Sequence, residues 1–131
     1  MENIEHYKSL LGKLLKVAMQ NARKANDVAC DADLYSSDHK SEAVLGYVSL
    51  AYSDFRSIWT IVNSVDGLEH PEFDNLMGKA DEFCNEFLDS LKSDHSQHWT
   101  DIHYGELVRI AYSVGLLLDV DPVTDDEKKT L

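Results

Sequence analysis

The sequence predicts an all-α protein: an antiparallel, up-down-up-down four-helix bundle with a short, flexible, acidic C-terminal tail. Apolar residues recur at alternating spacings of three and four along successive stretches of the chain. This pattern keeps one face of each helix turned toward a partner. Turn-forming clusters separate the stretches, and connections of only a few residues force neighbouring helices to run antiparallel.

The chain is 131 residues long, which is the size of one domain with one core. We assign residues 1–118 to a single helical-bundle domain. We assign residues 119–131 to a flexible tail, because they carry several charges and no apolar rhythm.

The first helix is expected to run from about Asn3, its N-cap, to about Asp33, on the order of 45 Å. Asn21 occupies a seam position, where a polar residue sets the register of a helix pair. The full stripe comprises Ile4, Tyr7, Leu11, Leu14, Ala18, Asn21, Ala25, Val28 and Ala32.

The second helix is expected to follow the cluster Ser36, Ser37 and Asp38, which supplies an N-cap, and to end at Asp66 and Gly67. Its stripe comprises Val44, Val48, Ala51, Phe55, Ile58, Val62 and Val65.

The third helix is expected to begin near Pro71, because proline fits the first turn of a helix. Its stripe comprises Phe73, Leu76, Met77, Ala80, Phe83, Cys84, Phe87, Leu88 and Leu91.

The fourth helix is expected after Ser93 and Asp94. Its apolar residues extend around much of its circumference, so it is either the most buried helix or one with a second contact face. Its stripe comprises Trp99, Ile102, Leu107, Ile110, Ala111, Val114, Leu117 and Leu118.

Five glycines lie inside the predicted helices, where each costs about 1 kcal/mol relative to alanine unless close packing explains it. We therefore expect close helix contacts at Gly12, Gly46, Gly78, Gly105 and Gly115.

The overall charge restricts the class of partner. Asp and Glu number 24 against 12 Lys and Arg, giving a net charge of −12. Nucleic acid and anionic membrane would repel such a protein, so neither is expected as a direct partner. A basic or apolar protein partner is expected, with the chain itself a monomer or a homodimer.

The start of the chain shows no secretory signal and no segment is apolar enough to span a membrane. A cytoplasmic location is therefore expected. The two cysteines, Cys30 and Cys84, lie among apolar residues, so we expect buried free thiols and no disulfide framework.

Most of the negative charge lies in the second half of the chain. Residues 67–131 hold fifteen acids and five bases, which gives −10 of the −12. Opposite the apolar stripe of the third helix, Lys79 is the one base among the acids. The acids on that face are Asp74, Asp81, Glu82, Glu86 and Asp89.

A solvated surface would explain this acidic face in the simplest way. The sharper interpretation is a docking face for a basic partner, such as the active site of a nuclease or another nucleic-acid-handling protein. Mimicry of DNA would be only partial, since 45 Å of duplex carries roughly 26 charges.

Histidines near the start of the fourth helix suggest an alternative, a metal-binding protein or enzyme. Asp94, His98 and Asp101 stand four and three residues apart and would share one helix face, with His95 and His103 nearby. An Asp at a helix N-terminus is also an ordinary cap, so the same residues fit a purely structural role.

Catalytic motifs are not found. Glu106 and Arg109, three residues apart, are expected to pair on the surface of the fourth helix, and no Ser, Cys or glycine-rich pattern indicates a nucleophile or phosphate loop. We expect no enzyme activity and no cofactor. Tyr52 and Tyr104 fall off the main stripes and are candidate interface residues.

The sequence thus predicts a non-catalytic acidic binding protein, most specifically a stoichiometric inhibitor or immunity-type protein that masks a basic partner. The metal-binding bundle and a structural homodimer or adaptor, using the second apolar face of the fourth helix, are the alternatives.

Overall fold

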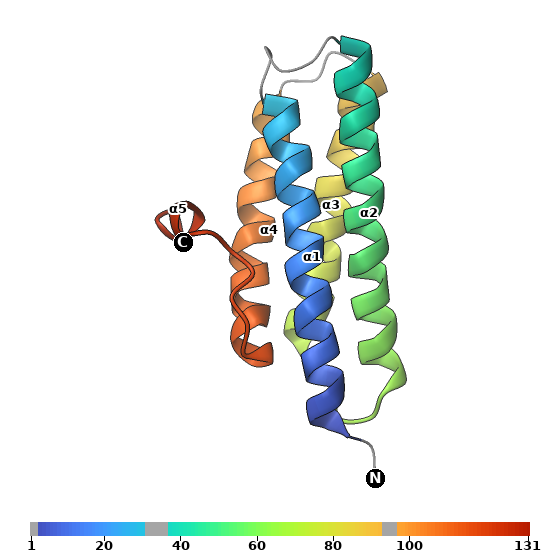
Figure 1. The fold of residues 1–131 in the computed structure, drawn as a ribbon, viewed down its shortest axis with the longest axis vertical. Helices are drawn as coiled ribbons and strands as arrows, with labels where there is room; N and C mark the ends of the chain where they lie inside the picture. The colour runs from blue at the N-terminus through green and yellow to red at the C-terminus, as the bar shows by residue number, and fades with distance from the viewer. Residues whose placement is uncertain (1–2, 31–36, 93–96) are drawn as a thin grey trace.

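The computed structural model describes the backbone of residues 3–30, 37–92 and 97–131, and these ranges contain helices and no strand (Figure 1). The four long helices are α1 (Ile4–Cys30), α2 (Ser37–Ser64), α3 (Pro71–Lys92) and α4 (Gln97–Leu118), and a short α5 (Asp125–Lys128) follows. Helices adjacent in the chain pack side by side, and α1 also packs against α4. The four-helix bundle is therefore confirmed.

Local signals explain where the helices begin and turn. The Asn3 side-chain oxygen accepts from the His6 backbone N–H at 3.1 Å, so Asn3 is the N-cap of α1. Gly67, after α2, has a φ of +92°, which glycine adopts without a steric cost. Pro71 is the first residue of α3, as predicted. The predicted end of the first helix, near Asp33, lies outside the described residues.

One hydrophobic core lies along the bundle axis and draws on all four long helices. Phe83 and Phe87 of α3 meet edge to face with ring centroids 4.7 Å apart, an arrangement that aromatic rings favour. The largest fully buried apolar side chains are Leu11, Leu15, Met19, Phe55, Ile58, Leu76, Phe83, Phe87, Leu107 and Val114. This shared core makes the four helices one packing unit.

Burial in α1 follows a helical period of 3.6 more closely than the predicted stripe. Leu15, Met19 and Ala22 are fully buried, whereas Leu14 and Asn21 are half-buried. A strict alternation of three and four drifts around a straight helix, which explains the difference.

The last thirteen residues require a correction. The sequence predicts a flexible tail, but residues 119–131, which we call the C-terminal strap, first turn back along α4 and then end in α5, which projects from the bundle (Figure 1). Glu127 of α5 is held by Arg23 of α1. Asp119 takes a left-handed φ of +58°, and the Val120 N–H donates to the Gly115 carbonyl at 3.0 Å. Pro122 and Val123 are buried. The missed signals are the C-cap turn and these two apolar residues.

The prediction of close helix contacts at all five glycines is also wrong. A Cβ on Gly12 would lie 2.7 Å from Val120 Cγ1, and one on Gly115 would lie 2.6 Å from Pro122 Cδ. Cβ atoms on the other three, Gly46, Gly78 and Gly105, would meet nothing within 4 Å among the described residues. Gly12 and Gly115 therefore allow close packing of the strap residues Val120 and Pro122, and not of another helix.

Candidate functional site

The predicted acidic face of α3 is accessible to solvent. Asp74 and Glu82 are exposed, and Asp81 and Glu86 are partly exposed. The fifth predicted residue, Asp89, has a side chain outside the described set. Four carboxylates of the predicted face therefore remain available on one helix.

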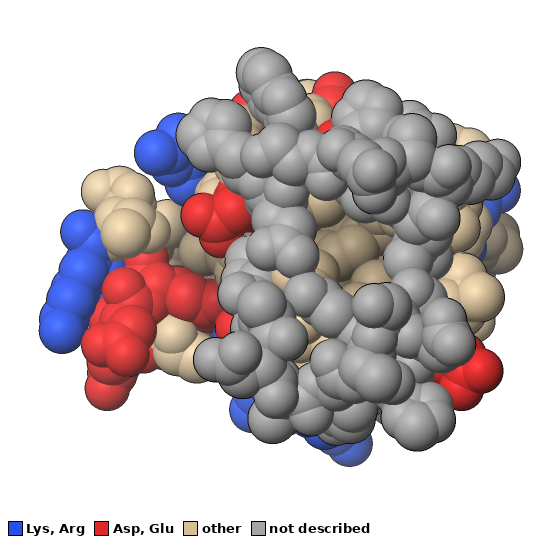
Figure 2. Space-filling view, turned by 90° about the horizontal axis from the view of Figure 1, so that it is seen from above, with Lys and Arg blue, Asp and Glu red and all other residues tan. Residues whose placement is uncertain are grey.

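Charges on the projecting strap are arranged differently. Figure 2 shows acidic and basic side chains next to each other on this part of the molecule. Lys128 forms an ion pair with Asp121, and Lys129 pairs with Asp126 at 3.3 Å. The strap acids Asp121 and Asp126 are thus each paired with a lysine of the strap, whereas on the predicted face of α3 one lysine, Lys79, pairs with Glu82.

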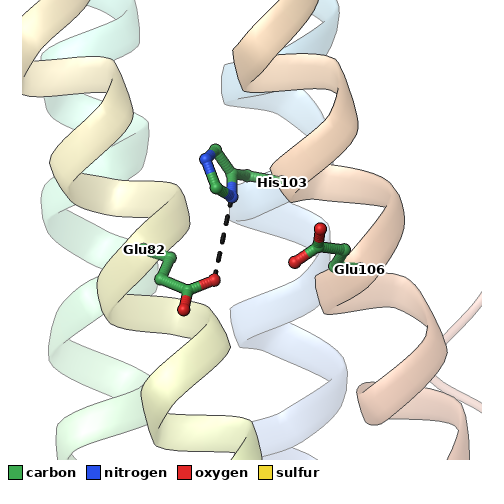
Figure 3. A group of neighbouring side chains, drawn as sticks. All are labelled: Glu82, His103 and Glu106. Carbon is green, nitrogen blue, oxygen red and sulfur yellow. Dashed lines mark ion pairs between the residues drawn. The ribbon is translucent and has the colours of Figure 1, made fainter.

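A second feature of α3 is a cluster that it forms with α4. Glu82 projects from α3 toward His103 and Glu106 of α4 (Figure 3), and one ligand atom from each lies within 4.8 Å of the others. His103 Nδ1 lies 3.8 Å from Glu82 Oε2. One imidazole and two carboxylates make a donor set that transition metals accept.

Lys79 lies between the two carboxylates of this cluster. Its Nζ donates to Glu106 Oε2 at 2.8 Å and to Glu82 Oε2 at 3.3 Å. The hydrogen bond from Lys79 lowers the pKa of Glu106, and the hydrogen bonds to Glu106 and Glu82 raise the pKa of Lys79. The predicted pairing of Glu106 with Arg109 is therefore replaced by a bridge between α3 and α4.

The cluster opens onto a groove between α3 and α4 with a volume of about 520 Å³. Its lining combines acidic, basic and small side chains: Asp74, Asn75, Gly78, Lys79, Glu82, Glu106, Arg109, Ile110 and Ser113. Solvent therefore reaches the cluster from the groove.

The predicted metal-ligand set is not brought together by any described contact. Asp94 and the His98 side chain lie outside the described residues. Asp101 is exposed and accepts from Asn26 Nδ2 of α1 at 3.3 Å. The sequence signal that does lead to the structural cluster is His103 and Glu106, three residues apart on one face of α4.

The two candidate interface tyrosines have different environments. Tyr52 of α2 is 36% exposed, and partial burial together with the Asp81 carboxylate of α3 raises its pKa. It stands at the edge of the acidic face and stays a candidate.

Tyr104 requires a correction, because it is only 7% exposed and packs against Phe83 with ring centroids 5.7 Å apart. Its hydroxyl donates to Glu127 of the strap. Burial, followed by this hydrogen bond, raises the pKa of Tyr104. The prediction of a surface role is wrong because the strap supplies a partner from 23 residues further along the chain.

Glu127 is the anchor of the strap. Its carboxylate accepts two hydrogen bonds from Arg23 of α1, Nε to Oε2 at 3.1 Å and Nη2 to Oε1 at 2.8 Å. Thr124 and Glu127 also form a capping box. Burial alone would raise the pKa of Glu127, but the hydrogen bonds from Arg23 and Tyr104 outweigh it and lower the pKa.

Cys84 is a free thiol and is only 3% exposed. Burial, with a smaller effect from Asp81, raises its pKa to about 12. The expectation of a buried free thiol is confirmed here, and such a thiol is a weak nucleophile. The Cys30 side chain lies outside the described set.

Comparison with known proteins does not assign a function. The sequence matches no protein-family model, and no curated protein or solved structure is significantly similar to it. Among the described residues, no helix combines the length and the apolar character needed to cross a bilayer.

Proposed function

We propose that this protein is a non-catalytic acidic binding protein, a stoichiometric inhibitor or immunity-type protein that masks a basic, nucleic-acid-handling partner. The observation that supports it is the charge of the outer face of α3. Exposed Asp74 and Glu82 lie there with partly exposed Asp81 and Glu86. The one described base on this face, Lys79, is already paired with Glu82 and Glu106.

Stability does not explain this face. Glu82 and Glu86 are four residues apart on the same helix, and like charges at this spacing destabilise a helix by a few tenths of a kcal/mol. A complementary basic surface would instead be attracted over a distance, which accelerates the encounter and selects the correct partner. Partner binding would therefore explain why these like charges lie close together on α3, whereas folding stability does not.

The test compares two variants of equal charge. One carries D74N, D81N, E82Q and E86Q on α3. The control carries E42Q, D66N, D125N and D126N at exposed sites elsewhere. Each variant loses four of the 24 acids and so moves the net charge from −12 to −8.

The partner is first captured from the native host on the immobilised wild-type protein, and association rates are then measured at several salt concentrations. We expect the α3 variant to associate about 10-fold more slowly at low salt, with a weaker salt dependence, and the control to stay near wild type. Equal rates for the two variants would remove α3 from the interface.

A homodimer is an alternative that exposed apolar residues of α4 support. Ile102, Leu116 and Leu117 are exposed there, Leu116 to 67%. Light scattering at high concentration separates the alternatives, because the proposed inhibitor does not require a dimer through these residues.

A further inference from the structure

The side chains of the α3–α4 cluster, Glu82, His103 and Glu106, are arranged so that a cation could bind between them. Glu82, His103 and Glu106 each aim one ligand atom at the same space. Imidazole nitrogen with carboxylate oxygens suits Zn²⁺ and similar transition metals, whereas Mg²⁺ prefers an octahedron of oxygens. The cluster therefore favours the first class of ion.

The Nδ1 atom of His103 is a second, independent observation. It is buried, and it finds no hydrogen-bond partner in the part of the chain that the structure describes. The His103 side chain as a whole is 24% exposed, and a buried polar atom without a partner is unfavourable. A metal ion bound at Nδ1 would remove that cost.

Lys79 indicates that the space between the carboxylates accepts positive charge. Its ammonium lies within 3.3 Å of both Glu82 and Glu106. The Lys79 side chain is 39% exposed, so its head group can swing into solvent along a flexible stem. An incoming cation would take over the position that the ammonium holds.

The required movement is small. Ligand atoms around a tetrahedral zinc lie roughly 3.4 Å apart, given bonds of about 2.0–2.2 Å. His103 Nδ1 and Glu82 Oε2 are 3.8 Å apart, and the whole set lies within 4.8 Å. Glu82 is 50% exposed, so rotation of its side chain can close the set without moving a helix.

We propose that Glu82, His103 and Glu106 form a binding site for one divalent transition-metal ion of the Zn²⁺ class, with Lys79 as the group that the ion displaces. The α3–α4 groove would leave the remaining coordination positions open to solvent. The site shares Glu82 with the proposed docking face, but it rests on the donor geometry. Its test requires no partner protein, so failure of the metal proposal and failure of the partner proposal are distinguishable.

The experiment is calorimetric titration of the full-length, metal-free protein with Zn²⁺, and with Mg²⁺ as the control ion. We expect one Zn²⁺ per chain and no saturable binding of Mg²⁺. Zn²⁺ should also raise the temperature of unfolding in a concentration-dependent way, because a ligand that binds the folded state stabilises it.

Variants decide whether these residues are the ligands. H103A and E106Q should each weaken Zn²⁺ binding at least 10-fold, by analogy with the cost of losing supporting groups at metal sites. H6A is the matched control, because His6 is an exposed histidine at the far end of the chain from His103, and it should bind like wild type. Circular dichroism checks that each variant is folded.

K79M distinguishes a metal site from a structural ion-pair cluster. Removing the competing ammonium should tighten Zn²⁺ binding roughly 30-fold, since a unit charge 4 Å from a divalent ion in water changes its binding by about that factor. Zn²⁺ binding that H103A and E106Q leave intact, an absence of saturable binding, or weaker binding by K79M would each overturn the proposal.

Discussion

The strap anchor and the α3–α4 cluster both pair a basic side chain with carboxylates, but they differ in burial and in how completely their polar atoms are hydrogen-bonded. Around Glu127, the side chains of Arg23 and Glu127 are 22% and 14% exposed, and every strong donor has an acceptor. Around Lys79, the side chains of Lys79 and Glu82 are 39% and 50% exposed, and His103 Nδ1 lacks a hydrogen-bond partner among the described residues. A saturated, buried set holds structure, whereas an open, incompletely satisfied set retains the capacity to bind.

The two regions also differ in their basic side chain, which is Arg23 at the strap anchor and Lys79 at the cluster. Arginine presents a planar fork that binds a carboxylate through two parallel hydrogen bonds, as Arg23 does with Glu127. Lysine is a flexible point charge that a competitor displaces more readily.

Removing the anchor should cost the most. E127A removes the acceptor of the Tyr104 hydroxyl and leaves the Arg23 guanidinium with only the Pro122 carbonyl as an acceptor among the described residues. Losing one partner of a largely buried pair costs about 3 kcal/mol. Urea unfolding should show that loss in the free energy of unfolding, unless the strap detaches first and limits it. E106A, at the exposed cluster, is the control and should cost much less. Equal losses for the two variants would contradict the comparison.

Alanine at two glycines should change stability in opposite directions. G115A places a methyl group 2.7 Å from the Val120 carbonyl oxygen and 2.6 Å from Pro122 Cδ, and overpacking of this kind costs about 2 kcal/mol. G78A in the α3–α4 groove meets no described atom within 4 Å and should stabilise α3 by up to about 1 kcal/mol. Thermal unfolding measures both, and a stabilising G115A would show that the strap does not rest on Gly115.

Acid should weaken the anchor before the rest of the fold. The pKa of Glu127 is below its ordinary value of 4.5 in the folded protein, so its contribution is complete above about pH 4.5 and is lost as pH falls through the folded pKa. E127Q has no carboxylate that could take up a proton there. The difference in unfolding free energy between wild type and E127Q should therefore narrow below pH 4.5, and a constant difference down to pH 3 would contradict this assignment.

The smallest effect is expected at the turn into the strap. Asp119 holds a φ of +58°, which glycine adopts with less strain. D119G should stabilise the protein by about 0.5 kcal/mol, after allowance for the greater freedom of glycine in the unfolded chain. A loss of stability in thermal unfolding would show that the Asp119 side chain contributes more than its backbone strain costs.

The sequence predicted the parts of the molecule that depend on local pattern. The order of the helices, the N-cap at Asn3, Pro71 at the start of α3 and the accessible acids of α3 all follow from spacing within one helix. The strap was missed because Glu127 meets Arg23 across 104 residues, a separation that helical periodicity does not report.

The α3–α4 cluster could be predicted only in part from the sequence. The spacing of His103 and Glu106 on α4 was visible, but the third member, Glu82, comes from another helix. Its place depends on the register between α3 and α4, and no local motif sets that register. The prediction of an interface role for Tyr104 was wrong for a related reason, because the strap that contacts its hydroxyl was expected to be a flexible tail.

Carboxylate labelling of the captured complex, read by mass spectrometry, tests most directly the claim that α3 is the working surface and the strap side is structural. Binding should protect Asp74, Asp81, Glu82 and Glu86 from a water-soluble carbodiimide, while Asp125 and Asp126 react as they do in the free protein. Protection of the strap acids with full reactivity on α3 would contradict the account.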